Sequence, residues 1–159
     1  IKIINFHKYW MKFAILQAKI ALINNEIPIG AVIVKNNKII STGNNQTLTT
    51  NNPLGHAEII AIQKASITIK NYKSLDFFIY ITKEPCLMCI GAILNFNIKN
   101  IIFGSFNINK NFNKNNILHS YLSKNNITYT GGINKNTCDS LLKYFIKKKN
   151  NIKIENIAF

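Results

Sequence analysis

A histidine and two cysteines, about thirty residues apart along the chain, constrain the fold more than any other feature. The histidine opens the sequence H-A-E at residues 56–58, and the cysteines lie in P-C-L-M-C at residues 85–89. One imidazole and two thiols form a ligand set for zinc. Structural zinc sites usually close with four protein ligands, whereas catalytic sites use three and keep a position for water. The sequence therefore predicts a catalytic zinc site that joins the two segments.

The spacing within each segment indicates how these side chains are held. Cys86 and Cys89 are three residues apart, so a helix that begins at Cys86 places both sulfurs on one face, about one turn apart. The start of such a helix also favours the thiolate form that binds a metal. His56 and Glu58 can both approach the metal only if His56 lies at the start of a helix. A carboxylate beside a zinc-bound water can move its proton, so Glu58 is the candidate general acid and base.

The length and composition are typical of one domain with a substantial core. The chain has 159 residues, of which 47% are hydrophobic, and it contains no apolar run long enough to span a bilayer and no signal peptide. Three cysteines, two of them predicted metal ligands, suit a reducing compartment better than a disulfide framework. We therefore expect a single domain over residues 1–159, located in the cytoplasm and without membrane association.

The charge balance is strongly basic. The net charge of +14 comes from 20 basic and 6 acidic residues, and every basic residue is a lysine. Such an excess is typical of proteins that bind a polyanion, with nucleic acid the first candidate and an anionic membrane surface the second. The missing arginine and the abundant Ile, Asn and Lys also fit the coding bias of an AT-rich genome. Charge alone therefore leaves two interpretations open, a dedicated binding surface and lysines on solvated faces.

Hydrophobic periodicity predicts a mixed α/β arrangement. Helices are expected at residues 7–24, 56–66, 86–95 and 119–123. A last helix is expected to begin at Asn136 or Thr137 and to carry Lys147 to Lys149 in its last turn. Strands are expected at residues 27–34, 38–41, 77–82, 99–104 and 127–130. Residues 105–118 carry no periodic signal and are expected to form a long loop. Strand, helix and strand over residues 77–104 form a βαβ unit with parallel strands. The pattern predicts one α/β domain with a mixed five-stranded sheet between helices.

Several stretches beyond the predicted metal ligands form a recognisable pattern. They are E-x-P-x-G-A-V and its neighbours at residues 26–34, then residues 43–45, 52–53, 56–59, 82–89 and 91–92, and toward the C-terminus Gly132, Cys138, 141–142 and Phe145. The H-x-E and P-C-x-x-C motifs are common to zinc nucleobase deaminases. With the E-x-P-x-G-A-V sequence and the C-terminal pattern, the chain from about His7 to Lys149 resembles in particular the bacterial tRNA-specific adenosine deaminases of the cytidine deaminase-like superfamily.

The resemblance implies a three-layer α/β/α cytidine deaminase-like fold and a zinc-dependent hydrolysis of adenosine to inosine at the wobble position of a tRNA anticodon. It implies one zinc per subunit, held by His56, Cys86 and Cys89, with Glu58 as the proton shuttle. It also implies a homodimer that binds the anticodon arm of tRNA. The implied substrate-binding residues are Asn45, Asn107, Phe145, Lys147 and Lys149.

Several positions depart from the family pattern. Asn52 stands where Asp commonly precedes the proline, Lys83 precedes the Glu-Pro-Cys sequence, and Asn107 replaces an Asp near the substrate backbone. The C-terminal arginines of the family correspond here to Lys147 to Lys149. These lysines keep the charge for phosphate contacts but lose the bidentate geometry of a guanidinium group.

Two other functions remain open from the sequence. A deaminase of a free base, such as cytosine or guanine, shares the metal site but needs no basic surface. A non-catalytic RNA-binding subunit that keeps zinc for stability has no need of Glu58, which is not a ligand. Single residues also have simpler interpretations: Asn45 as a turn residue, Cys138 as a small core residue, and Glu84 as a structural hydrogen-bonding partner beside the cysteines.

Overall fold

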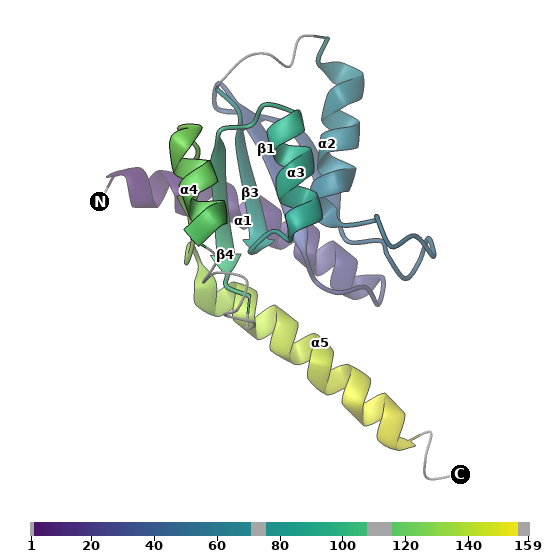
Figure 1. Ribbon diagram of the computed structural model, residues 1–159. Coiled ribbons are helices and arrows are strands. Elements are labelled where there is room, and N and C mark those ends of the chain that lie inside the picture. Colours follow the sequence, from purple (N-terminus) through teal and green to yellow (C-terminus); the bar gives the residue numbers. More distant parts are fainter. Residues whose placement is uncertain (1, 71–75, 108–115, 156–159) are drawn as a thin grey trace.

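The computed structural model describes residues 2–70, 76–107 and 116–155 (Figure 1). Helices and strands follow one another in the predicted order. They are α1 (Lys2–Ile23), β1 (Gly30–Lys35), β2 (Lys38–Asn44), α2 (Ala57–Thr68), β3 (Phe78–Lys83), α3 (Leu87–Asn95), β4 (Asn100–Ser105), α4 (Asn116–Lys124), β5 (Thr128–Thr130) and α5 (Lys135–Glu155).

The strands form one five-stranded sheet in the order β2-β1-β3-β4-β5. β1 pairs antiparallel with β2 and β3, whereas the β3–β4 and β4–β5 pairs are parallel. The β1–β2 hairpin turns at Asn36 and Asn37, whose φ angles are +49° and +56°. Asparagine tolerates such left-handed conformations, which two-residue hairpin turns require. The mixed sheet and its βαβ unit are therefore confirmed.

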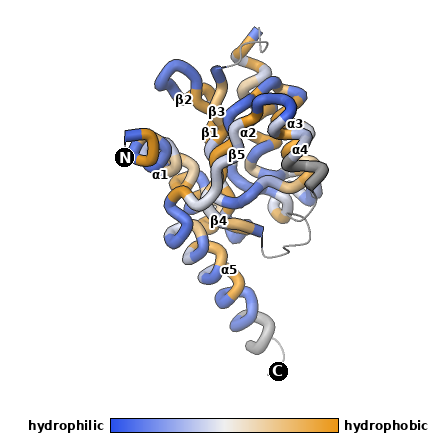
Figure 2. Tube along the Cα trace, turned by 60° about the vertical axis from the view of Figure 1, so that its left-hand side comes forward, coloured by the Kyte–Doolittle hydropathy of each residue, from blue (hydrophilic) through white to orange (hydrophobic). Residues whose placement is uncertain are grey.

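Helices cover both faces of the sheet, which confirms the three-layer α/β/α fold (Figure 1). Successive residues of a strand point to opposite faces. Ala31 and Ile33 of β1 pack in one core with α2 and α3, and Val32 and Val34 pack in the other with α1. Because the middle strands are buried on both faces, they are apolar along most of their length, as Figure 2 shows for β1 and β3.

Small residues let α2 lie very close to the sheet. Ala57, Ala61 and Ala65 repeat every four residues on the buried side of this helix. They face β2, where a Cβ added to Gly43 would overlap the carbonyl oxygen of Ala57 and lie 2.7 Å from the backbone nitrogen of Ala61. The close packing of β2 and α2 therefore depends on a glycine at residue 43.

The structure also corrects some predicted boundaries. α1 begins at Lys2, ahead of the predicted residue 7, and α4 begins at Asn116, inside the predicted loop at 105–118; residues 108–115 of that loop lie outside the described residues. α5 continues to Glu155, so the placement of Lys147 to Lys149 in the last turn is wrong. Over the described ranges, no helix combines the length and the hydropathy needed to cross a membrane.

Candidate active site

The two predicted ligand segments begin α2 and α3, which pack against each other on one side of the sheet (Figure 1). His56 is the N-cap of α2, with φ −70° and ψ 148°, and Cys86 is the N-cap of α3, with φ −77° and ψ 170°. Cys89 lies in the first turn of α3. This helix follows the carboxyl end of β3, a common position for functional residues in α/β sheets. The helix starts inferred from the two spacings are therefore confirmed.

The three side chains meet at a geometry that fits zinc. Nδ1 of His56 lies 3.7 Å from Sγ of Cys86 and 3.5 Å from Sγ of Cys89, and the ligand atoms all lie within 4.8 Å of one another. A tetrahedral zinc ion with ordinary Zn–N and Zn–S bonds separates its nitrogen and sulfur ligands by about 3.6 Å. The donor set and its distances therefore fit a zinc ion without rearrangement.

The two thiols differ in acidity. The pKa of the Cys86 thiol is lowered to about 5, chiefly by a hydrogen bond with Cys89 and in part by the backbone N–H groups of Cys89 and Met88, whereas burial opposes this shift. The same hydrogen bond, together with burial, raises the pKa of Cys89. An N-cap sulfur that faces backbone N–H groups is stabilised as a thiolate. The lowered pKa favours the thiolate form of Cys86, which is the form that binds a metal.

Glu58 lies in the first turn of α2 and is buried, with 4% of its surface exposed. Burial raises the pKa of its carboxyl group; its own backbone N–H, the charge of His56 and a hydrogen bond with Cys89 lower it in part. The contact with Cys89 places this carboxyl beside the ligand set, although Glu58 is not itself a member of that set. A carboxyl group so placed can exchange protons with a reacting molecule at the site.

Comparison with known proteins identifies the family. Residues 4–105 match the family model of the cytidine and deoxycytidylate deaminase zinc-binding region. The chain is 41% identical over 148 residues to the tRNA-specific adenosine deaminase of Buchnera aphidicola subsp. Schizaphis graminum, a match that covers 91% of this chain and 97% of that protein. The chain belongs to the tRNA-specific adenosine deaminase family. It is also 34% identical over 150 residues to the member from Haemophilus influenzae, covering 91% of this chain and 85% of that one.

Solved structures agree with the fold of this family. A structure from a study of A-to-I editing by tRNA:A34 deaminases at the wobble position of transfer RNA is 26% identical, with a TM-score of 0.74 over 84% of this chain and 99% of that chain. A guanine deaminase from Bacillus subtilis is 33% identical, with a TM-score of 0.60 over 72% of this chain and 74% of that one. Because both enzymes share the fold, the fold alone does not decide the substrate.

Asn45, one of the predicted substrate-binding residues, follows β2 and is buried, with 2% of its surface exposed. Its backbone N–H donates to the carbonyl of Ile29 at 3.0 Å. Its side-chain nitrogen donates to a carboxylate oxygen of Glu26 at 3.1 Å and to the hydroxyl of Thr47 at 3.0 Å. These bonds give Asn45 one orientation. An ordinary turn residue at the surface has no such set of buried partners.

Asn107, another predicted substrate-binding residue, is tied to the segment that carries the cysteines. Its backbone N–H donates to Glu84 Oε2 at 2.9 Å, and its side-chain nitrogen donates to the Glu84 carbonyl at 3.3 Å. Glu84 is buried and also accepts a hydrogen bond from the hydroxyl of Tyr129 at 3.2 Å. The structural role predicted for Glu84 is therefore confirmed, and it fixes the chain at Asn107 beside the zinc ligands.

Phe145, Lys147 and Lys149 lie on the part of α5 that extends away from the sheet (Figure 1). The ammonium of Lys149 lies 5.6 Å from the centre of the Phe145 ring. Lys148, between them, donates to Oδ1 of Asn25 at 3.0 Å, next to Glu26. Cys138 is buried at the start of the same helix, as predicted for a core residue. Within residues 2–70, 76–107 and 116–155, no hydrogen bond or ring contact joins Phe145, Lys147 or Lys149 directly to the zinc ligands.

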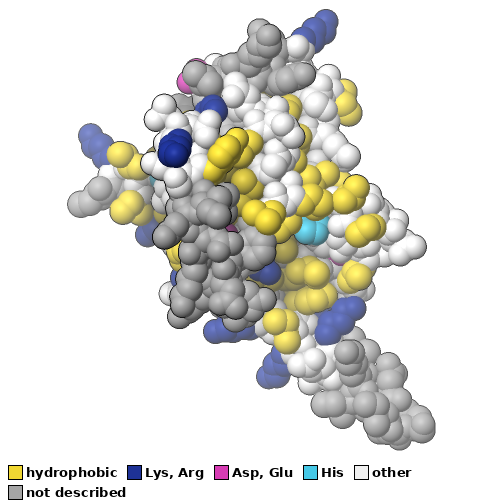
Figure 3. Space-filling view, viewed as in Figure 1, with side chains coloured by type: hydrophobic (Ala, Val, Ile, Leu, Met, Phe, Trp, Pro, Cys, Tyr) yellow, Lys and Arg dark blue, Asp and Glu magenta, His cyan; other side chains and the backbone are white. Residues whose placement is uncertain are grey.

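Exposed apolar side chains surround the site. Figure 3 shows a histidine at the surface with hydrophobic side chains around it, on the face where α2 and α3 begin. Five apolar side chains of the segments that form the site are exposed. The exposed fraction is 45–56% for Leu48, Leu54, Leu87 and Phe106, and 36% for Met88. Contiguous exposed apolar surface of this kind marks a binding site or an interface between subunits.

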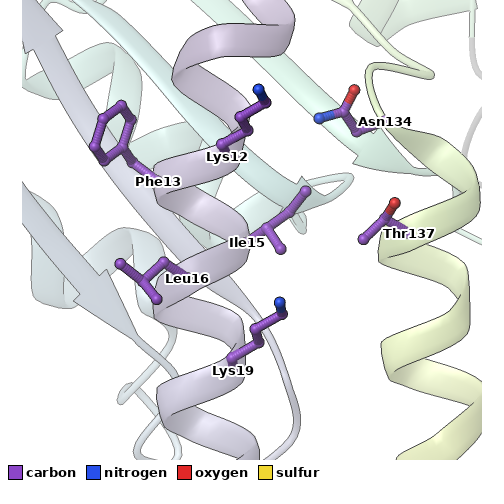
Figure 4. A pocket seen from close by; sticks show the side chains of 7 residues that line it. All are labelled: Lys12, Phe13, Ile15, Leu16, Lys19, Asn134 and Thr137. Atoms are coloured by element: carbon purple, nitrogen blue, oxygen red, sulfur yellow. The ribbon is translucent and has the colours of Figure 1, made fainter.

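A separate groove lies between α1 and the start of α5 (Figure 4). Its volume is about 450 Å³, and Lys12 and Lys19 of α1 face Asn134 and Thr137 across it. Because α1 and α5 cover the face of the sheet opposite α2 and α3, this groove is not part of the site at His56.

Proposed function

We propose that this protein converts adenosine to inosine at the wobble position of a tRNA anticodon, with one zinc ion per subunit. The observation that carries the proposal is the buried carboxyl of Glu58 beside a three-residue zinc ligand set. A structural zinc site needs four protein ligands and no such carboxyl. The substrate is inferred from relatives named tRNA-specific adenosine deaminase, which match 91% of this chain. The family model matches residues 4–105, and we propose that the deaminase domain comprises the whole of residues 1–159.

The residues present divide the chemistry among them. His56, Cys86 and Cys89 would hold the zinc, which supplies a Lewis acid that makes water a stronger nucleophile near neutral pH. The carboxylate of Glu58 takes the proton of the water that attacks C6 of adenine and donates it to the ring. Glu58 then takes the remaining proton of the hydroxyl group added at C6 and donates it to the amino group, which leaves as ammonia. Because Glu58 is buried, few solvent molecules compete for these protons.

The remaining predicted residues are assigned to substrate binding. The carbonyl oxygen of Asn45 accepts a hydrogen bond from the base, and Asn107 contacts the substrate backbone. Phe145 offers an aromatic face for a nucleotide, while Lys147 and Lys149 contact phosphates of the anticodon arm.

A second subunit completes the proposed assembly. The exposed apolar side chains around the site, among them Leu54, Leu87 and Phe106, support a homodimer in which they are covered. Cys86 and Cys89 must stay reduced to bind zinc, and neither forms a disulfide, which supports the cytoplasm as the location.

The direct test is inosine formation on an anticodon stem-loop RNA with adenosine at the wobble position, using zinc-loaded protein. We expect conversion of this RNA and none of free guanine or cytosine. Conversion of free guanine alone would favour the activity of the related Bacillus subtilis enzyme. RNA binding without any deamination by folded, zinc-containing protein would indicate the non-catalytic subunit.

The double variant Lys147→Ala/Lys149→Ala should bind the RNA more weakly and with a smaller salt dependence. Each phosphate contact that is lost lowers the slope of log K against log salt concentration by about 1. We expect KM to rise several-fold and kcat to remain unchanged. The matched control is Lys38→Ala/Lys64→Ala, which removes two exposed lysines from β2 and from the later turns of α2. If both double variants lose the same RNA affinity, the overall charge of the protein determines binding, and Lys147 and Lys149 make no specific phosphate contacts.

A further inference from the structure

Glu26 is a buried carboxylate that holds the loop after β2. It exposes 1% of its surface, and its two oxygens accept three hydrogen bonds. Oε1 accepts the backbone N–H groups of Leu48, at 2.7 Å, and Thr49, at 2.6 Å, and Oε2 accepts the side-chain nitrogen of Asn45 at 3.1 Å. Within the described part of the chain, no lysine forms an ion pair with Glu26. N–H groups of this one loop therefore stabilise the charge in place of a cation.

These bonds decide which way the Asn45 side chain faces. A carboxylate can only accept hydrogen bonds, so the Asn45 nitrogen must point toward Glu26. The second proton of that nitrogen goes to Thr47. Among the described residues none donates to Oδ1 of Asn45, and this oxygen remains available as an acceptor. Glu26 thereby presents Asn45 as an acceptor for an N–H group of the substrate.

The same loop is attached directly to the zinc ligand His56. The backbone N–H of Gln46 donates to the carbonyl of Gly55 at 2.8 Å. A Cβ added to Gly55 would lie 3.2 Å from the carbonyl carbon of Gln46, so the two backbone segments are in tight contact. Asn45 precedes Gln46, and His56 follows Gly55. The Asn45 acceptor is therefore held at a fixed position relative to the helix start that carries His56.

We propose that Glu26 is a positioning residue for the deaminase reaction: it orients the carbonyl oxygen of Asn45 toward the substrate base and holds residues 45–49 beside His56. This inference rests on the proposed function, because it assigns Asn45 to the substrate. Only 6 residues of the chain are acidic, and Glu26, Glu58 and Glu84 are buried. Glu58 borders the ligand set, Glu84 fixes Asn107, and Glu26 fixes Asn45. The buried carboxylates of the described residues therefore all serve the site.

The test is an exchange of donor and acceptor between residues 26 and 45. Glu26→Gln keeps the size of the side chain but turns one acceptor into a donor, so a bond to Asn45 or to the loop N–H groups is lost. We expect kcat/KM on the stem-loop RNA to fall about tenfold. Asn45→Asp sets two carboxylates against each other and should cost more. In Glu26→Gln/Asn45→Asp the amide of Gln donates to Asp, so kcat/KM should recover above that of Asn45→Asp.

The control separates positioning from stability. Ser41→Ala removes a buried 2.7 Å hydrogen bond from β2 to the Ala61 carbonyl, away from the loop. We expect it to lower the melting temperature and leave kcat/KM unchanged. If Glu26→Gln behaves like Ser41→Ala, or if the losses of the two single variants multiply in the double variant, the positioning role is wrong. If the wild-type protein forms no inosine, the proposed function fails instead, and the two failures are distinguished.

Discussion

Glu58→Gln should lower kcat for inosine formation by about a thousandfold while the protein still folds and binds zinc. Glutamine has nearly the same size and can occupy the same buried place in the first turn of α2. It cannot accept the proton of the attacking water or donate one to the ring and the leaving amino group. The expected loss therefore falls on kcat and not on KM, because Glu58 transfers protons during the reaction and is not assigned to binding the substrate.

Zinc content separates this result from the loss of the metal. We expect Glu58→Gln to retain one zinc per chain by elemental analysis, since Glu58 lies beside the ligand set and does not belong to it. Cys89→Ser removes a ligand and should lower both the zinc content and the melting temperature. Undiminished turnover by zinc-loaded Glu58→Gln would contradict the proton-transfer role. Loss of zinc from this variant would show instead that Glu58 helps to hold the metal.

Local spacing made the metal site predictable from sequence. The interval between Cys86 and Cys89 is one helical turn, and the interval between His56 and Glu58 requires a helix start, so both segments specify their own backbone geometry. The βαβ unit places the start of α3, with the cysteines, at the carboxyl end of β3. The helix that carries His56, α2, packs against α3 on the same side of the sheet, and the two segments therefore meet. Residues whose role depends on their own helix could therefore be recognised without the fold.

Glu26 could not be recognised in the same way. Its partners lie 19, 22 and 23 residues away, in a loop without periodic pattern. In the sequence Glu26 is the first residue of the E-x-P-x-G-A-V pattern, but this pattern indicates the family and gives no role to the carboxyl group. The end of α5 was missed for another reason, since no glycine or proline follows Lys149 to mark where the helix stops. Long-range hydrogen bonds and helix ends without breakers leave little trace in a single sequence.

Gly43→Ala should destabilise the protein by about 3 kcal/mol and weaken zinc binding. The added methyl group would overlap the carbonyl oxygen of Ala57 and lie 2.7 Å from the nitrogen of Ala61. Both are backbone atoms of α2, so no side-chain rotation relieves the overlap and the helix must move away from β2. Ala57 follows His56 directly, and this movement would shift the imidazole relative to the two thiols.

Gly91→Ala is the matched control for this change. Gly91 is exposed within α3, and a Cβ added there meets no atom within 4 Å. Because alanine has the higher helix propensity, the control should gain about 1 kcal/mol. Urea unfolding of zinc-loaded protein measures both free energies, and competition with a chelator measures the zinc affinity. If Gly43→Ala is as stable as the wild type, β2 and α2 can separate without cost. If it unfolds more easily but binds zinc as tightly, the position of His56 does not depend on the contact between Gly43 and Ala57.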